Sequence, residues 1–415
     1  MRQITADDRS RWSIVVLLFV SLFFIYGPLY AGGVFFLPLL RSFGWSRAQL
    51  AALGGVGAIA AGVSGPFIGW LIDRIGVRAM MIGGAAAIVL CDLALSRANS
   101  FAQFAAISVV SGAAFAAATF IPCSIVIANW FTSERGLAMG VAFAAIPLGG
   151  TGITPLANYV VQHHGWRVGY LAMGLPIAAI VIPALAAFLR ERPSAPVDAP
   201  GVKPEAIFLP GLEVREALRS RSFWVIALAQ LMFTTSWVGM GAHFIPYIVG
   251  IGYTPATAAA IVSASFVLSA GGNLMIGLLA DRLKGRMVMA LVCVSAAGGL
   301  MFLFAAARGS ALAANLVLFA TVSGTPTVLM PMVIADSLGL RRLGSMLGIT
   351  GISGTIGFAA GPIIAGRVYD VTGSYSDALW LFIALSLAAA VAFLGCRPLA
   401  QEQSRRTALV DASAA

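Results

Sequence analysis

The sequence predicts an all-α integral membrane protein with twelve transmembrane helices in two similar six-helix bundles. Three observations predict this class: an apolar composition, twelve long apolar runs, and a decapeptide that occurs once in each half of the chain. Of the 415 residues, 60% are hydrophobic and only 10% are charged, with a mean hydropathy of +0.93. A soluble domain keeps about a quarter of its residues charged. We therefore expect lipid, rather than water, to cover most of the surface.

The apolar runs have the length that a membrane helix requires, about 20 residues for roughly 30 Å of hydrocarbon. The first six cover residues 13–39, 49–72, 78–97, 101–128, 137–161 and 167–189, and the second six cover residues 222–250, 255–280, 287–306, 309–334, 344–367 and 377–396.

A polar, proline-rich stretch separates the two sets of runs. The predicted organisation is a cytoplasmic tail at 1–12, a bundle at 13–189, a cytoplasmic linker at 190–221, a second bundle at 222–396 and a cytoplasmic tail at 397–415. Residues 212–221 of the linker could form a surface helix with Leu212 and Leu218 toward lipid. A plain connecting helix is the alternative.

Basic residues collect on one side of these spans. When alternate loops are assigned to opposite sides, 20 of the 26 Lys and Arg residues fall on the side of the two termini. This bias predicts that both termini are cytoplasmic, and it accounts for the net charge of +10 without a nucleic-acid partner. The four cysteines lie in or at the ends of spans, so we expect no disulfide framework, metal site or cofactor.

The repeated decapeptide reads "GWLIDRIGVR" at 69–78 and "GLLADRLKGR" at 277–286. Each copy lies between the second and third spans of its half. Asp73 and Asp281 can accept hydrogen bonds from a neighbouring helix N-terminus or pair with an arginine, and such contacts would close the cytoplasmic side during alternating access. A single copy could equally reflect the basic bias of cytoplasmic loops. The gating candidates are Asp73, Arg74, Arg78, Arg135, Asp281 and Arg282.

Three further motifs carry a family resemblance. Together with the repeated loop, "NWFTSERGLAMG" (129–140), "GWRVGY" (165–170) and "GPIIAGRVYDVTGSY" (361–375) resemble the major facilitator superfamily, and within it the bacterial monocarboxylate and oxalate/formate transporter-like branch. The resemblance implies that the first, fourth, seventh and tenth spans line a central cavity.

The same resemblance locates positions that hold cationic or acidic groups in that branch. Asn273 stands at the position of an eighth-span arginine, Ser269 at that of an aspartate one turn earlier, and Tyr30 at that of a first-span lysine. Because a buried anion without a cationic partner is costly, we expect hydrophobic monocarboxylates or their neutral forms rather than small dianions.

Two ionisable side chains are expected within the membrane and are candidates for proton coupling, His243 and Asp92. His243 could carry a proton, or it could be a hydrogen-bonded histidine that faces outer-loop groups. Asp92 could be functional, or it could pair with Arg97 or water. Gly239 and Pro246 would allow the seventh span, which contains His243, to bend or unwind.

The remaining substrate-binding candidates are polar or aromatic residues on spans expected to line the cavity. For most of the Ser and Thr residues, a hydrogen bond to their own helix is the alternative. The full set is Tyr26, Tyr30, Thr119, Cys123, Ser124, Gln230, Trp237, His243, Ser269, Asn273, Thr325 and Thr327.

These observations favour a secondary active transporter that moves a small organic solute, above all a monocarboxylate-type organic acid, by proton coupling or exchange. Its partners would be the solute, the lipid bilayer and protons, and it would function as a monomer. The alternative is an efflux transporter for lipophilic or cationic compounds, which would need an acid in the cavity, with Asp92 as the candidate. The sequence lacks an HExxH motif, paired intramembrane aspartates and a phosphate-binding loop, which argues against an enzyme and against direct use of ATP.

Overall fold

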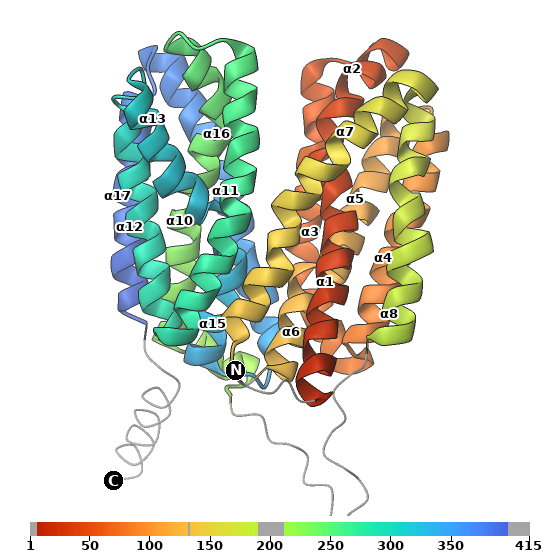
Figure 1. Ribbon diagram of the computed structural model, residues 1–415, viewed down its shortest axis with the longest axis vertical. Helices are drawn as coiled ribbons and strands as arrows, with labels where there is room; N and C mark the ends of the chain where they lie inside the picture. The colour runs from red at the N-terminus through yellow and green to blue at the C-terminus, as the bar shows by residue number, and fades with distance from the viewer. Residues whose placement is uncertain (1–5, 132, 190–210, 397–415) are drawn as a thin grey trace, which may run out of the picture.

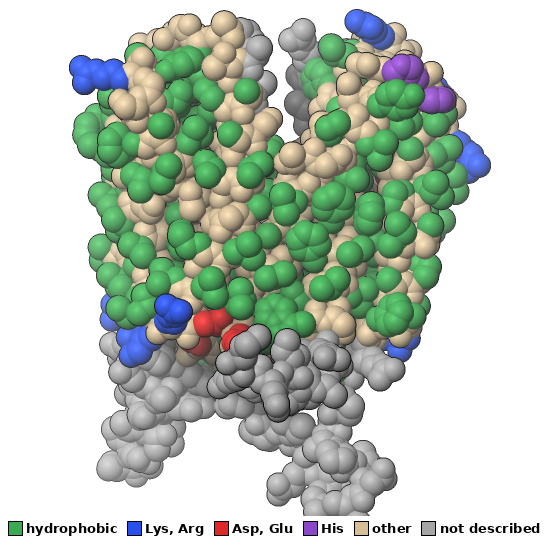
Figure 2. Space-filling model, viewed as in Figure 1, with side chains coloured by type: hydrophobic (Ala, Val, Ile, Leu, Met, Phe, Trp, Pro, Cys, Tyr) green, Lys and Arg blue, Asp and Glu red, His purple; other side chains and the backbone are tan. Residues whose placement is uncertain are grey.

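The computed structural model describes residues 6–131, 133–189 and 211–396. Helices form two bundles that stand side by side and diverge toward one end (Figure 1). The opposite end carries the start of α1 and the loops at residues 76, 133–134, 283–284 and 339–342, and we call it the terminus side; the other end is the far side. Hydrophobic side chains cover the belt between the two ends on the face in Figure 2, as a lipid-facing surface requires. The all-α membrane fold is therefore confirmed.

The first bundle contains these helices: α1 (Ala6–Tyr30), α2 (Gly32–Phe43), α3 (Arg47–Ile75), α4 (Val77–Arg97), α5 (Phe101–Ala118), α6 (Phe120–Trp130), α7 (Arg135–Pro176), the π-helical turn η1 (Ile177–Val181) and α8 (Ile182–Phe188). The linker helix α9 (Val214–Leu218) and the second bundle follow: α10 (Arg221–Gly250), α11 (Pro255–Arg282), α12 (Gly285–Leu303), α13 (Gly309–Asn315), the π-helical turn η2 (Leu316–Ala320), α14 (Thr321–Ser323), α15 (Pro326–Leu338), α16 (Leu343–Thr372) and α17 (Ser376–Leu394).

These helices account for twelve crossings. Ten helices in the described ranges are long and apolar enough to span a membrane, and the pair Gly309–Ser323 and Pro326–Leu338, bent by 48°, makes an eleventh. One of the ten, Arg135–Phe188, has 54 residues, about twice the length that one crossing needs. It leaves the helical conformation at Gly165, where φ is 82°, and the chain turns back there. Its two arms are the predicted fifth and sixth spans.

Three spans are interrupted near their middle, which the sequence pattern did not predict. The first breaks at Ala31, the fourth at Thr119 with φ −120° and ψ −110°, and the tenth at Gly324 and Thr325. A proline lies within four residues of each break, and proline removes a backbone donor from the helix. The breaks thus occur in three of the four spans expected to line a cavity.

The seventh span behaves differently. α10 continues through Gly239 and Pro246, so the expected unwinding does not occur. A Cβ at Gly239 would overlap the Phe382 ring and lie 3.0 Å from the Gly361 carbonyl oxygen. The glycine therefore serves close packing against α16 and α17, and it does not weaken the helix there.

The two halves repeat with an offset of 208 residues. This offset relates Asp73 to Asp281, and Gly69 to Gly277. It also relates Gly136 to Gly344. In the structure, Gly69 packs against the backbone of Gly344, and Gly277 packs in the same way against Gly136. Glycine-to-glycine contacts therefore join α3 to α16 and α11 to α7 on the terminus side, as expected for close helix packing.

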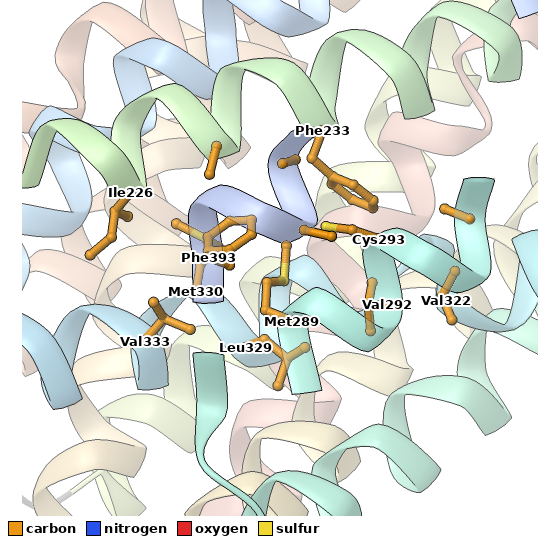
Figure 3. Packing of buried hydrophobic residues seen from close by; sticks show 14 of the residues in the cluster. Ile226, Phe233, Met289, Val292, Cys293, Val322, Leu329, Met330, Val333 and Phe393 are labelled. Carbon is orange, nitrogen blue, oxygen red and sulfur yellow. The ribbon is translucent and has the colours of Figure 1, made fainter. Parts of the chain in front are cut away.

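Each half also has its own buried core. In the second half, Phe233, Met289, Met330 and Phe393 pack together from α10, α12, α15 and α17 (Figure 3). A second cluster fills the first half around α1, α4 and α7. The larger cluster also includes first-half residues where the halves meet, Ile68, Ile72, Ile121 and Ile125, so a rotation of one half against the other has to repack this part of the core.

The segments outside the bundles differ in part from expectation. α1 begins at Ala6, within the predicted tail, and the rest of the linker (190–210) and the tail at 397–415 lie outside the described residues. Leu212 does not face lipid, because it is buried and its N–H donates to the Leu338 carbonyl oxygen at 2.9 Å. α9 is therefore a connecting helix docked on the second half.

Candidate functional site

A cleft opens between the two halves on the far side (Figure 2). Tyr30 of α1 and Phe266 of α11 meet across the halves, edge to face, with 5.3 Å between ring centroids. Beyond Tyr30, a Cβ added at Gly32 or Gly33 would have no neighbouring atom within 4 Å, so this part of the first span borders open space. Phe266 lies fifteen residues before Asp281, which at 1.5 Å per residue puts this ring contact about 22 Å above the terminus-side loop. The halves are therefore closed on the terminus side and separated above this pair.

The first span approaches the break in the fourth span at Tyr26. The hydroxyl of Tyr26 lies within interaction range of the side chain of Thr119, the residue at which α5 ends. The Tyr26 ring also meets Phe115 edge to face at 4.7 Å. Tyr30, one turn further on, packs against Gly150 of α7. Two predicted site residues, Tyr26 and Thr119, are thus brought together.

A second polar group surrounds the break in the tenth span. The side-chain amide of Asn273 donates to the Phe143 carbonyl oxygen at 3.2 Å and so joins the two halves. Its Oδ1 is buried and has no hydrogen-bond partner among the described residues. A Cβ at Gly324 would meet both Asn273 and the Ser269 hydroxyl, so the break lies directly against these two side chains. Asn273 therefore offers a free acceptor beside an irregular backbone.

The other hydroxyl candidates bond to their own helices, as the alternative interpretation predicted. Each hydroxyl donates to a carbonyl oxygen three or four residues earlier, at 2.6–2.7 Å; the donors are Thr119, Ser124, Thr325 and Thr327. Cys123 is fully buried and Trp237 is half-buried. The Gln230 Oε1 atom is buried without a partner in the described ranges, so Gln230, like Asn273, has an unused acceptor.

His243 lies toward the far-side end of α10, between α16 and the start of α17. Its Nε2 is 3.0 Å from the Pro362 carbonyl oxygen and its Nδ1 is 3.0 Å from the Tyr375 hydroxyl. Because a carbonyl only accepts, Nε2 carries a hydrogen. Burial, reinforced by Tyr369 and Asp370, raises the pKa of Tyr375, so its hydroxyl stays protonated and can donate to Nδ1. The neutral ring is therefore fully hydrogen-bonded.

Asp92 lies away from the cleft. Its helix, α4, packs mainly on α5 and α7, and its carboxyl group lies beside Gly174 on the descending arm of α7. The expected pair with Arg97 does not form in the described ranges, and the Asp92 Oδ2 atom is buried without a partner there. This placement gives no support to a cation site in the cleft.

Asp281 joins the halves on the terminus side through the backbone of α7. Its two carboxylate oxygens accept from the N–H groups of Gly136 and Leu137 at 2.7 and 2.8 Å. A carboxylate at a helix N-terminus is stabilised by the free N–H groups and by the helix dipole. This is the first of the two contacts expected from the repeated decapeptide.

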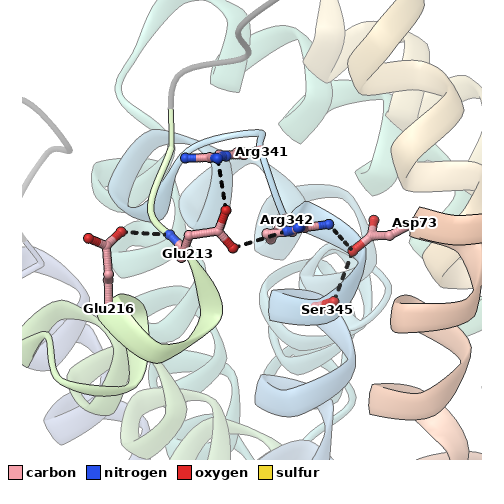
Figure 4. A network of polar contacts seen from close by, with 6 residues as sticks. All are labelled: Asp73, Glu213, Glu216, Arg341, Arg342 and Ser345. Carbon is pink, nitrogen blue, oxygen red and sulfur yellow. Dashed lines mark hydrogen bonds and ion pairs between the residues drawn. The ribbon is translucent and has the colours of Figure 1, made fainter.

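Asp73 joins the halves at the equivalent place, through side chains. Its Oδ2 accepts from the Ser345 hydroxyl at 3.0 Å and lies 3.7 Å from an Arg342 nitrogen. Glu213 of the linker binds both Arg342, at 3.2 Å, and Arg341, at 3.0 Å (Figure 4). Sequence reasoning missed these partners. The 208-residue offset would have indicated the start of α16 as the partner of Asp73, but nothing in the sequence indicates Glu213.

The four arginines among the gating candidates differ in whether their contacts lie within one half or cross between the halves. Arg135 lies within electrostatic range of Asp336 of α15, across the halves. Arg74 stacks on Trp70 and Arg78 donates to a carbonyl of α8, so these contacts stay within the first half. Arg282 is exposed beside a groove in the second half. Arg135 thus interacts across the two halves within the described residues.

Comparisons with known proteins agree with this architecture. The model of the Major Facilitator Superfamily matches residues 17–332 and 244–413. Monocarboxylate transporter 13 of Bos taurus is 24% identical over 373 residues, which cover 89% of this chain and 85% of the relative. The uncharacterized MFS-type transporter YcxA of Bacillus subtilis is 24% identical over 294 residues, 68% of each chain. The transporter FucP, in its outward conformation, has a TM-score of 0.72 at 16% identity, covering 92% of this chain and 98% of FucP, a likeness that shows the fold alone.

Proposed function

The chain belongs to the Major Facilitator Superfamily, and from this premise we propose that it is a secondary active transporter that moves a monocarboxylate-type organic acid by alternating access, with proton coupling or exchange. Membership and the transporters among its relatives make it a membrane solute transporter and not an enzyme. The substrate class and the coupling are the proposal.

One observation carries the alternating-access mechanism: the two halves are joined on the terminus side and separated on the far side. Both joints come from the repeated decapeptide, through Asp73 and Asp281. A transporter of two duplicated bundles must break such joints to expose the solute on the other side. The Asp73 and Asp281 contacts have the right chemistry for this, because they are polar and partly solvated.

The substrate class follows from the polar groups at the breaks. Tyr26, Asn273 and Gln230 offer hydroxyl and amide groups, and no Lys or Arg is among the buried residues of the described ranges. Uncharged donors and acceptors suit a protonated acid or a hydrophobic monoanion better than a dianion, which would need cationic partners. The name of the Bos taurus relative, a monocarboxylate transporter, supports the same class.

For proton coupling, His243 is the better candidate of the two. It lies on the seventh span, and protonation would turn its Nδ1 from an acceptor into a donor toward Tyr375. Asp92 lies between α4 and α7, outside the cleft. We further propose a monomer in a bacterial inner membrane with both termini in the cytoplasm, which would make the terminus side the cytoplasmic side.

Transport by the purified protein in liposomes tests the substrate class. Labelled solutes of three charge classes, a monocarboxylate, a dicarboxylate and an organic cation, are supplied with an inward proton gradient and in counterflow, each at two pH values. We expect accumulation of the monocarboxylate, with greater uptake at the lower pH. Transport of the cation alone, or of the dicarboxylate in preference to the monocarboxylate, would overturn the proposal.

Substitution of His243 tests the coupling separately. His243→Ala should abolish gradient-driven uptake and leave counterflow largely intact, because counterflow needs no net proton movement. His164→Ala, at an exposed position on the far side, is the matched control. Gradient-driven uptake that persists in His243→Ala would refute this role without affecting the substrate assignment.

A further inference from the structure

An open apolar groove runs along the lipid-facing surface of the second half. It has a volume of about 470 Å³ and is lined by α11, α12 and α14. Three large exposed side chains, Met275, Leu278 and Leu291, form its walls. Val292 and Val322, which belong to the core cluster of this half, form part of the base of the groove (Figure 3). The groove is outside the cleft, so the transport pathway does not account for it.

One end of the groove carries a positive charge. Arg282, the last residue of α11, lines the groove on the terminus side and is exposed. Within the described ranges it makes no ion pair, because the carboxylate of its neighbour Asp281 is bound to the α7 backbone. The hydroxyl of Ser295, also in the lining, donates to the Leu318 carbonyl oxygen at 2.9 Å. Arg282 is thus the polar side chain in the groove lining that can still bind a ligand.

The equivalent place in the first half carries two aromatic rings. Adding the 208-residue offset converts Phe67, Trp70 and Arg74 into Met275, Leu278 and Arg282. Phe67 and Trp70 lie 5.6 Å apart between ring centroids, and Arg74 stacks on the Trp70 ring at 3.9 Å. In the second half, smaller side chains replace both rings, and the arginine loses its aromatic partner. The replacement of the Trp70 ring by Leu278 therefore both widens the surface groove and leaves Arg282 without an aromatic partner.

We propose that this groove binds an anionic phospholipid, with an acyl chain between α11 and α12 and the phosphate of the headgroup on Arg282. An apolar groove that ends at a cation, at the depth of the membrane–water interface, matches a lipid in shape and in charge. The lipid would hold the end of α11 one residue from Asp281, so its occupancy would bias the terminus-side contact. We expect no such lipid in the first half, where the Trp70 ring already engages Arg74.

Native mass spectrometry of the full-length protein in detergent, titrated with phosphatidylglycerol or phosphatidylcholine, tests this site. We expect one phosphatidylglycerol to bind more tightly than phosphatidylcholine. Arg282→Gln should weaken that binding about fivefold, the effect of one basic residue near the surface, ~1 kcal/mol. Leu278→Trp should abolish it by filling the groove as Trp70 does. Arg74→Gln is the matched control and should bind as the wild type does.

Wild-type binding in Leu278→Trp or in Arg282→Gln would overturn the proposal, as would equal loss in Arg74→Gln or equal binding of the two lipids. Thermal unfolding establishes that the variants are folded. If Leu278→Trp does not fold, Leu291→Trp fills the same groove from α12 and takes its place.

Discussion

Replacement of Asp281 by asparagine perturbs the joint between the halves with the least change in shape. The carboxylate accepts two hydrogen bonds, from Gly136 at 2.7 Å and from Leu137 at 2.8 Å. Asparagine retains one oxygen, loses the charge, and presents an NH₂ group to the second N–H. The variant therefore loses one hydrogen bond and the attraction to the positive end of α7.

The size of the effect follows from these losses. A hydrogen bond to a charged group contributes about 1.5–3 kcal/mol, and a charge at a helix N-terminus about 0.3–1 kcal/mol. Asp281 is exposed, so solvent screening brings the expected total down to about 1–2 kcal/mol. Because 1.4 kcal/mol is tenfold in an equilibrium constant, Asp281→Asn should shift the ratio of open to closed terminus side about 5- to 30-fold.

Pulsed electron paramagnetic resonance distances measure this ratio. Spin labels at Ile75 and Lys284 report from equivalent loops of the two halves, and both positions are exposed. Asp281→Asn should increase the population at longer distances. Asp370→Asn, at an exposed position on the far side, makes the same chemical change and should leave the distances unaltered.

The equivalent variant, Asp73→Asn, should have a smaller effect. Its remaining oxygen can still accept from the Ser345 hydroxyl at 3.0 Å, and only the 3.7 Å contact with Arg342 is lost. An exposed ion pair of that length contributes about 1 kcal/mol or less. If Asp73→Asn opened the terminus side more than Asp281→Asn, or if neither variant changed the distances, the reasoning from contact geometry would be refuted.

Three further substitutions probe other features. Gly69→Ala should also favour long distances between the same labels, because its methyl group overlaps the backbone of α16, whereas Gly83→Ala, with open space around it, should not; equal behaviour of the two would contradict close packing as the cause. Tyr30→Ala should destabilise the closed terminus side by about 0.5–1.5 kcal/mol through loss of the ring contact with Phe266, and Tyr30→Phe should retain it, as the same labels would show. His243→Phe loses two hydrogen bonds and should lower the stability by about 1–3 kcal/mol, so an unchanged apparent Tm in detergent would argue against their formation.

Much of the fold could be predicted from the sequence because it depends on local patterns. The length of apolar runs determines the number of crossings. The duplicated decapeptide located Asp73 and Asp281 at equivalent loops. Asp281 accepts from the N-terminus of α7, one of the two kinds of partner expected, whereas the partners of Asp73 are the side chains of Ser345 and Arg342. The breaks at Ala31 and Thr119 were not predicted, because glycine, proline and threonine occur as often in continuous membrane helices.

The contacts of the candidate site depend on which segments meet, and a single sequence does not contain that information. The Phe143 carbonyl that receives the Asn273 amide is a backbone group without a side-chain signal. Glu213 belongs to the linker, where a charged residue is unremarkable in composition. For His243 both interpretations began from the same residue, and only the positions of Pro362 and Tyr375 show that its ring is fully hydrogen-bonded.

The interrupted helices have a consequence for the energetics of permeation. Where a helix stops, several backbone N–H and C=O groups lose their intrahelical partners, and hydrocarbon offers no replacement. Some bonds continue across the breaks, such as that from the Ala31 N–H to Gly27, and we expect water to satisfy the groups that remain in the first, fourth and tenth spans. A solute that enters the cleft can keep part of its hydration shell down to this level. The cost of dehydration is then confined to a short septum near the closed end and does not extend over the full thickness of the bilayer.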